Sequence, residues 1–138
     1  MRIKINTHGG PMPERHGEWI DLSTAAPAFL KPFEYKRISL GVSMELPHGY
    51  YAEVVPRSST CEKWGIILAN SMGVIENDYN GDDDIWQFPA VAIRETYIPE
   101  GTRICQFRLV KQQEEAELEP VDSLGNDNRG GFGSTGQF

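Results

Sequence analysis

The segment Pro56-Arg57-Ser58-Ser59 carries side chains suited to binding a phosphorylated ligand. It follows an apolar run and precedes a predicted helical turn. Hydroxyl groups and free backbone amides at the start of a helix, next to an arginine, can bind an anion. Residues of these types also cap helices without any ligand, so the segment by itself leaves both interpretations open.

A second segment, Gly73-Val74-Ile75-Glu76-Asn77-Asp78-Tyr79-Asn80-Gly81, is interpreted as a β-hairpin with its turn at Asn-Gly. On a strand, Glu76 and Asp78 would point to the same face. A carboxylate there could take a proton from water, and Tyr79 could cover a sugar or a base. A solvated hairpin tip has a similar composition, so this segment alone does not decide the chemistry.

The glycine-rich residues 128–138 form the third segment. Glycine lets backbone amides approach phosphate oxygens closely, and Arg129 offers a bidentate cation. Ser134 and Thr135 add hydroxyl groups, while Phe132 can stack on a base. The segment is not a Walker loop, because it lacks the lysine and no helix follows it. A glycine-rich terminus without a ligand is often a disordered tail.

The elements that must position these segments are β-strands. Short alternating or β-branched runs are frequent, whereas helical periodicity is hard to find. Strands are predicted at residues 2–6, 19–24, 33–44, 50–56, 65–69, 84–88, 91–97, 103–110 and 116–121. One short helix is predicted at 58–64, with a capping box formed by Ser59 and Glu62 and a stop at Gly65. Many short strands predict a sandwich or distorted barrel, in one domain of residues 1–127 followed by an arm of residues 128–138.

Composition limits the function classes. A net charge of −7 argues against duplex nucleic acid as a partner but allows a small phosphate ligand. No apolar run is long enough to span a membrane, and residues 1–6 do not read as a signal peptide. Cys61 and Cys105 lack metal-ligand spacing, so both are expected to be free, buried thiols in a reducing cytoplasm.

In sequence order, five segments resemble the five motifs of the trimeric dUTPase (dUTP pyrophosphatase) family. They are residues 19–22, 56–58, 73–81, 101–106 and 129–136. Any one motif is weak, but five in order are specific, and residues 58–60 and 82–88 are most similar to a phage-associated branch. The resemblance implies an all-β, jelly-roll-like distorted barrel that forms a homotrimer. It also implies hydrolysis of dUTP to dUMP and pyrophosphate with Mg²⁺, in sites that lie between subunits.

The resemblance also implies roles for individual residues. Asp21 and Gln106 would orient waters around Mg²⁺, and Arg57 would help to hold the second motif in place. The base and sugar would be held by the third motif and the residue before it, namely Asn70, Gly73, Ile75 and Tyr79. The phosphates would be contacted by Ser58 and Ser59. A flexible arm from a neighbouring subunit would close over the site with Arg129, Phe132, Gly133, Ser134 and Thr135.

Glu76 is the main departure from the family pattern, which has an aspartate as the base that activates water. The extra methylene group moves the carboxylate by roughly 1 Å, a displacement that can lower a rate about a hundredfold. Asp78 is a reserve base. Glu76 therefore motivates a second hypothesis, a weakened catalyst that acts as a nucleotide-gated binding protein with a regulatory partner. A third hypothesis is a dCTP deaminase, a related family with the same fold and a catalytic glutamate, although the fourth and fifth motifs favour a dUTPase.

Overall fold

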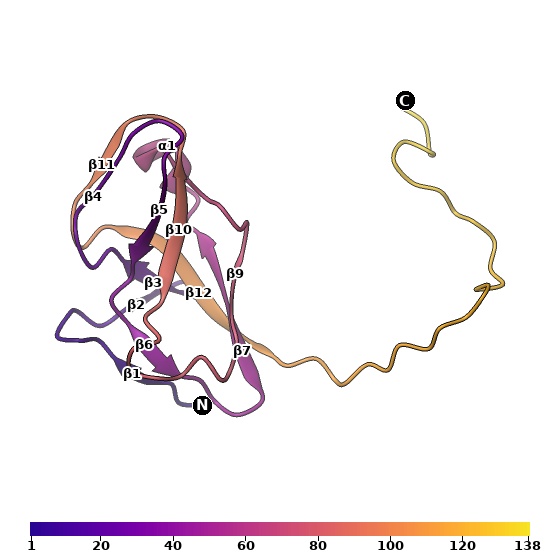
Figure 1. Cartoon of the computed structure of the whole chain (residues 1–138), viewed down its shortest axis with the longest axis horizontal. Coiled ribbons are helices and arrows are strands. Elements are labelled where there is room, and N and C mark those ends of the chain that lie inside the picture. Colours follow the sequence, from indigo (N-terminus) through magenta and orange to yellow (C-terminus); the bar gives the residue numbers. More distant parts are fainter.

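The computed structural model describes residues 1–138, and its folded part consists almost entirely of β-strands (Figure 1). The strands are β1 (Lys4–Asn6), β2 (Glu14–His16), β3 (Trp19–Ser23), β4 (Ala28–Leu30), β5 (Tyr35–Ser39), β6 (Ser43–Glu45), β7 (Tyr50–Pro56), β8 (Ile66–Leu68), β9 (Gly73–Ile75), β10 (Gln87–Ala92), β11 (Thr96–Ile98) and β12 (Arg103–Lys111). The one helix is α1 (Thr60–Trp64). This confirms the all-β prediction with a single short helix.

The strands form four antiparallel sheets around one core. Their orders are β1-β6, β5-β10-β8, β11-β4 and β2-β3-β12-β7-β9. The core holds 20 buried apolar residues, among them Trp86 and Phe107, whose rings meet edge to face at 5.1 Å. Apolar side chains alternate with polar ones along the central strands, as expected for sheets with one buried face.

The five-stranded sheet matters most for function because it aligns polar residues from distant parts of the sequence. Its register places Gln106 of β12 opposite Asp21 of β3 on one side and opposite Val55 of β7 on the other. Glu14 of β2 lies opposite Asp21. Side chains directly opposite one another share a face of the sheet, so these four residues form one row across it.

Several predicted strand bounds were wrong. Residues 33–44 do not form one strand, because Gly41 adopts a φ of +69° in the left-handed region and separates β5 from β6. A side chain there would also meet Ala25, since an added Cβ would lie 2.9 Å from its Cβ. The predicted strands at 84–88 and 91–97 are β10 and β11 with shifted bounds, and β2 and β4 were not predicted.

The helix begins later than predicted, and its predicted capping box does not form. Ser59 makes no side-chain cap hydrogen bond. The hydroxyl of Thr60 instead accepts the backbone N–H of Arg57 at 3.0 Å. The predicted stop at Gly65 is confirmed, because Gly65 has a φ of +66° and its N–H donates to the carbonyl of Cys61.

After Lys111 the chain leaves the sheets, and the remaining residues are exposed (Figure 1). The strand predicted at 116–121 is absent. Beyond a hydrogen bond from the Gln112 N–H to the Gly49 carbonyl, the hydrogen bonds of this segment are local to it. None of the helical structure has the length and apolar character needed to cross a membrane.

Candidate active site

Asp21 is a buried carboxylate held between two arginines. Its side chain is 4% exposed, and its Oδ2 lies 3.1 Å from Arg103 Nη1 and 3.5 Å from Arg57 Nε. A buried carboxylate is tolerated when charged donors replace the lost water, and two guanidinium groups do so here. The arginines come from opposite flanks of β3, so the sheet register is what brings this group together.

Gln106 lies directly beside Asp21 in the sheet. Its Nε2 donates to the carbonyl of Pro56 at 3.3 Å, at the end of β7. The structure therefore brings Asp21, Arg57 and Gln106 together, three residues that stand far apart in the sequence. A carboxylate, a guanidinium and an amide at one edge can bind phosphate oxygens and orient water molecules.

A buried hydroxyl positions the second motif. Thr60 Oγ1 accepts the Arg57 N–H at 3.0 Å and donates to the Ile104 carbonyl at 2.7 Å. Ser58 and Ser59, between these anchors, are exposed and free to contact a ligand. Sequence reasoning missed Thr60, although its place next to the predicted phosphate-binding serines was a usable signal.

Arg103 is a second residue that sequence reasoning did not single out. It lies in the fourth motif, and besides Asp21 its Nη1 contacts His16 Nε2 at 2.9 Å. Arg57 Nη1 donates to the Arg103 backbone carbonyl at 3.4 Å. The cationic character of this edge therefore comes from two arginines that also hold each other in place.

The predicted hairpin at residues 73–81 does not form. β9 pairs instead with β7, where Ile75 lies opposite Ala52 and Gly73 opposite Val54. An added Cβ on Gly73 would lie 3.1 Å from the Val54 side chain, so a glycine allows this close approach. After β9 the chain turns, and the Tyr79 N–H donates to the Glu76 carbonyl at 3.1 Å.

Glu76 and Asp78 therefore stand on a turn rather than on alternating strand positions, yet both line one cavity of about 300 Å³ with Tyr79. Its remaining lining residues are Val74, Ile75, Ile85, Trp86 and Gln87. The Tyr79 hydroxyl donates to the Ile85 carbonyl at 3.4 Å. Asn70, predicted beside the base, is exposed in the turn before β9. An apolar cavity with a few acidic groups suits a nucleoside.

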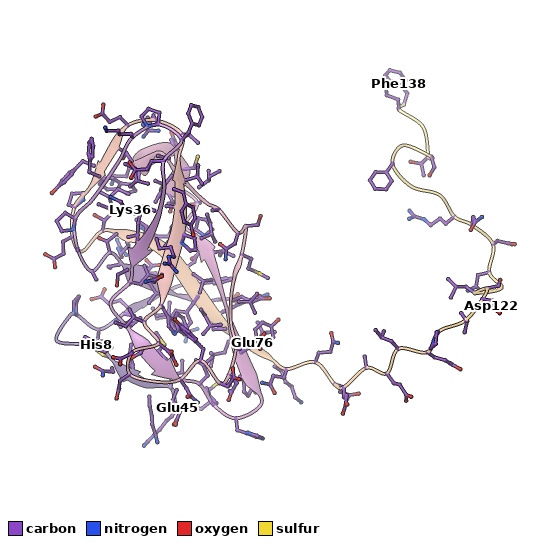
Figure 2. All side chains as sticks on the ribbon, viewed as in Figure 1. His8, Lys36, Glu45, Glu76, Asp122 and Phe138 are labelled. Carbon is purple, nitrogen blue, oxygen red and sulfur yellow. The ribbon has the colours of Figure 1, made fainter.

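This acidic turn and the arginine edge lie at opposite ends of β7. Ile75 pairs with Ala52, so the next position, Glu76, comes level with Tyr51, six residues before Arg57. At about 3.3 Å per residue this separation is about 20 Å. Figure 2 shows Glu76 at the end of the body from which the C-terminal segment departs, and Figure 1 shows α1 at the other end. A general base acts within roughly 3 Å of its proton donor, so one chain does not bring Glu76 to the arginine edge.

The predicted arm residues are not brought to either group. Arg129, Phe132, Gly133, Ser134 and Thr135 are exposed, and their segment bonds only to itself, as in the turn from Ser134 N–H to the Gly131 carbonyl. The arm extends away from the body (Figure 2). Its residues can reach a site only by contacting another chain or by changing conformation.

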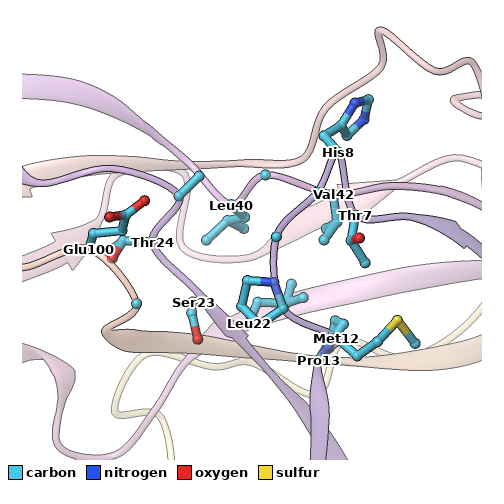
Figure 3. Close-up of a pocket in the computed structure, with 16 residues that line it drawn as sticks. Thr7, His8, Met12, Pro13, Leu22, Ser23, Thr24, Leu40, Val42 and Glu100 are labelled. Carbon is cyan, nitrogen blue, oxygen red and sulfur yellow. The ribbon is translucent and has the colours of Figure 1, made fainter.

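The largest cavity, about 480 Å³, lies elsewhere (Figure 3). It is lined by the loop of residues 7–13 together with Leu22, Leu40 and Glu100 among others. None of the predicted site residues lines it. The largest hollow in one chain is therefore not the predicted site.

The side chains fit a metal ion that arrives with a triphosphate. No group of three or more His, Cys, Asp or Glu side chains is placed to hold a metal ion. Asp21 and Gln106 supply one carboxylate and one amide on neighbouring strands. Mg²⁺ keeps several waters and often takes phosphate oxygens as ligands, so these two groups fit a role through water.

Two groups have shifted pKa values. Burial, and then the charge of Asp21, raise the pKa of the Cys105 thiol far above its ordinary range. Burial and the nearby Glu53 carboxylate raise the pKa of Tyr51, whose hydroxyl donates to Glu53 at 3.2 Å. Both cysteines are free as predicted, but Cys61 is exposed rather than buried.

Comparison with known proteins identifies the family. The dUTPase family model matches residues 18–136. The chain is 56% identical over 120 residues to the SPbeta prophage-derived deoxyuridine 5'-triphosphate nucleotidohydrolase YosS of Bacillus subtilis, covering 87% of this chain and 84% of that protein. It is 37% identical over 146 residues to the deoxyuridine 5'-triphosphate nucleotidohydrolase of Finegoldia magna, covering 99% of each.

Solved structures show the same fold. A variant of the dUTPase of Staphylococcus bacteriophage 80alpha, solved with dUpNHpp, has a TM-score of 0.78 at 20% identity and covers 99% of each chain. The dUTPase of Streptococcus mutans has a TM-score of 0.74 at 21% identity, covering 83% of this chain and 98% of that one. The jelly-roll-like prediction and the phage-associated branch are thereby confirmed, and the chain belongs to the dUTPase family.

Proposed function

We propose that this chain hydrolyses dUTP to dUMP and pyrophosphate with Mg²⁺ as its cofactor. The observation that carries the proposal is the match of the dUTPase family model to residues 18–136. Relatives at 56% and 37% identity are named deoxyuridine 5'-triphosphate nucleotidohydrolases. These findings favour dUTP hydrolysis over the dCTP deaminase and over a chain that only binds nucleotide.

The active enzyme is a homotrimer with sites between subunits. The support is the separation of about 20 Å along β7 between Glu76 and Arg57, which is too long for one chain to supply both groups to one phosphate. A second chain that places its acidic turn against the arginine edge of the first would complete the site. The exposed arm, attached after β12, has the length and freedom to reach a neighbouring chain. The domain of residues 1–127 and the arm of residues 128–138 are distinct parts of this proposal.

At the arginine edge the chain binds the triphosphate. Ser58 and Ser59 donate to phosphate oxygens, and Arg57 adds positive charge and holds the motif. Asp21 and Gln106 orient water molecules around the metal site. When bound with the nucleotide, Mg²⁺ neutralises phosphate charge and polarises the phosphate oxygens. The dUTPase of phage phi11 of S. aureus has been described with a structural Mg(II) ion, a protein to which this chain is 19% identical.

At the acidic turn the chain binds the nucleoside. The backbone from Gly73 to Tyr79, with Ile75, holds uracil, and Asn70 lies beside the base. Tyr79 packs against the deoxyribose and excludes a ribose 2'-hydroxyl, since a filled pocket leaves that hydroxyl without room or a partner. Exposure of Tyr79 at the cavity edge supports this role.

Glu76 removes a proton from a water molecule whose oxygen attacks the α-phosphorus. The bond between the α-phosphorus and its bridging oxygen to the β-phosphate breaks, and that oxygen leaves with pyrophosphate. The arm closes over the bound nucleotide and excludes bulk water. In the closed state Arg129 contacts the terminal phosphate, Phe132 covers uracil, and the phosphates are also met by Gly133, Ser134 and Thr135.

A regulatory protein partner stays a prediction. The dUTPase of Staphylococcus bacteriophage 80alpha is described as controlling transfer of virulence genes by a proto-oncogenic G protein-like mechanism. This chain shares its fold at 19% identity. A partner of this chain would be expected to distinguish the nucleotide-bound from the free form.

Pyrophosphate release from dUTP tests the proposal directly. We expect Mg²⁺-dependent release that stops with a chelator and is absent with UTP and dCTP. Glu76→Gln should remove turnover and keep nucleotide binding, whereas Glu76→Asp should remain active. A chain that binds dUTP tightly without turnover, and that Glu76→Asp revives, would support the nucleotide-gated binding hypothesis instead. Release of ammonia from dCTP would support the deaminase.

A further inference from the structure

His16 makes a specific contact at the edge of the candidate site. Its Nε2 lies 2.9 Å from Arg103 Nη1, and the same Nη1 lies 3.1 Å from Asp21 Oδ2. His16 ends β2, a strand that lies outside the five family motifs quoted above. Its presence beside Arg103 is therefore a feature of this chain that the motif assignments do not explain.

The chemistry of this contact fixes the state of the imidazole. Arg103 Nη1 carries two hydrogens, and one goes to Asp21 while the other is free for His16. Arginine only donates, so His16 Nε2 must accept and its proton must lie on Nδ1. A protonated His16 could not accept and would instead pair with Glu14, whose Oε2 lies 3.5 Å from the same Nε2. The arginine is thus held from two sides only when His16 is neutral.

Two-sided support matters because the other arginine contact is longer. Arg57 Nε lies 3.5 Å from Asp21 Oδ2, whereas Arg103 lies at 3.1 Å. The Arg103 side chain is 42% exposed, so without a second anchor it can move among solvated rotamers. Any such movement removes a charged donor from the buried Asp21 carboxylate.

We infer that His16 is a positioning residue that acts through Arg103, holding its guanidinium against Asp21 at the triphosphate end of the site. This inference rests on the proposed function for its kinetic consequence, but the contact itself can be tested in the protein without nucleotide. His16 touches neither substrate nor metal site.

The first test is nuclear magnetic resonance of the imidazole nitrogens in the full chain near neutral pH. We expect His16 to carry its proton on Nδ1, with Nε2 unprotonated. Replacing Arg103 with methionine keeps an unbranched apolar stem and removes the donor, so this bias toward the Nδ1-protonated form should be lost. A His16 that carries its proton on Nε2 in the unmodified chain would overturn the inference.

The second test compares variants kinetically. In His16→Phe we expect KM for dUTP to rise about fivefold, the scale of one lost hydrogen bond, with kcat within about twofold and an unchanged melting temperature. The Mg²⁺ concentration for half-maximal activity should rise with it. His16→Gln keeps an acceptor near the Nε2 position and should stay close to the unmodified enzyme. His48→Phe is the matched control, since His48 lies in the turn before β7, and it should have no effect.

A double-mutant cycle separates action through Arg103 from a general effect. In the Arg103→Met background, His16→Phe should add no further change in KM, because the group it positions is gone. An equal and additive effect in both backgrounds would overturn the inference, as would a His16→Gln variant as impaired as His16→Phe. If the unmodified chain does not hydrolyse dUTP, the proposed function fails, while the imidazole measurement still decides the contact.

Discussion

The Thr60 hydroxyl donates a 2.7 Å hydrogen bond to the backbone carbonyl of Ile104, and this buried contact joins α1 to β12. The same oxygen accepts the Arg57 N–H at 3.0 Å. One side chain, 1% exposed, thereby fixes the second motif to the strand that carries Arg103 and Gln106. The position of Arg57 depends on this tertiary contact, because the predicted capping box does not form.

Replacing Thr60 with valine should therefore weaken both the fold and the activity. The change leaves the Ile104 carbonyl without its hydroxyl donor, and an unsatisfied buried group costs about 1–3 kcal/mol. We expect the free energy of unfolding to fall by about that amount in urea denaturation at fixed chain concentration. The value of kcat/KM should fall because Arg57 and Ser58 shift. Thr60→Ser keeps the hydroxyl and is the control, so a valine variant as stable as the serine variant would contradict the assignment.

Mixing two inactive variants should restore activity if sites form between chains. Arg57→Ala removes the arginine edge and Glu76→Gln removes the base, so each trimer of one variant should be inactive. After subunit exchange at equal concentrations, about a quarter of sites would combine an intact Arg57 from one chain with an intact Glu76 from another in a closed symmetric ring. The measurement is the rate of pyrophosphate release before and after exchange.

No recovery after verified exchange would place both groups of each site in one chain. Recovery of that size would confirm that the separation of about 20 Å along β7 is bridged by a neighbouring subunit. Exchange can be verified by mass spectrometry of isotopically labelled chains. A mixture of Arg57→Ala with itself in labelled and unlabelled form is the control for effects of exchange alone.

Removing residues 128–138 should abolish turnover without destabilising the folded body. Within one chain these residues contact no part of the sheets, so the melting temperature should stay within a few degrees. We expect kcat/KM to fall by about a hundredfold or more, since closure and phosphate positioning are lost. Removing only Gln137 and Phe138, which follow the fifth motif, is the control and should leave activity unchanged. A large loss of stability in the longer truncation would show that the arm has a structural role.

Cys105 should make the protein less stable at alkaline pH. Its pKa is raised in the folded state, by burial and by Asp21, whereas an unfolded cysteine has a pKa of about 8.5. Below that pH both states hold the proton and stability is unaffected. Above it the unfolded state releases the proton and the folded state keeps it, so stability falls as pH rises, by about 2 kcal/mol at pH 10.

Cys105→Ala should flatten this alkaline slope relative to the unmodified protein, and urea denaturation between neutral pH and pH 10 measures the difference. A thiol reagent should modify Cys61 quickly in the native protein and Cys105 only after unfolding, because Cys61 is exposed and Cys105 is buried. Cys61→Ser is the control and should leave the alkaline slope unchanged. Parallel slopes for the unmodified protein and Cys105→Ala would contradict the assignment.

Sequence patterns predicted the central strands well where alternation is long and regular. β7 has the predicted bounds, and β12 differs by one residue at its end. Short strands were missed or misplaced, as at β2 and β4, because three residues carry too little alternation to be distinguished from a loop. Residues 116–121 alternate suitably but find no partner strand in this chain, and alternation alone does not make a strand.

The sequence by itself determined the family, the β-rich class and the residue types at the site, because the motifs and their order are local features. Only the tertiary structure decided which of those residues meet. Sheet register brings Asp21, Arg57 and Gln106 together and adds Arg103 and His16, while pairing of β9 with β7 carries Glu76 to the other end. Register and strand pairing are contacts between residues distant along the chain, and they depend on packing of the whole core rather than on any local pattern.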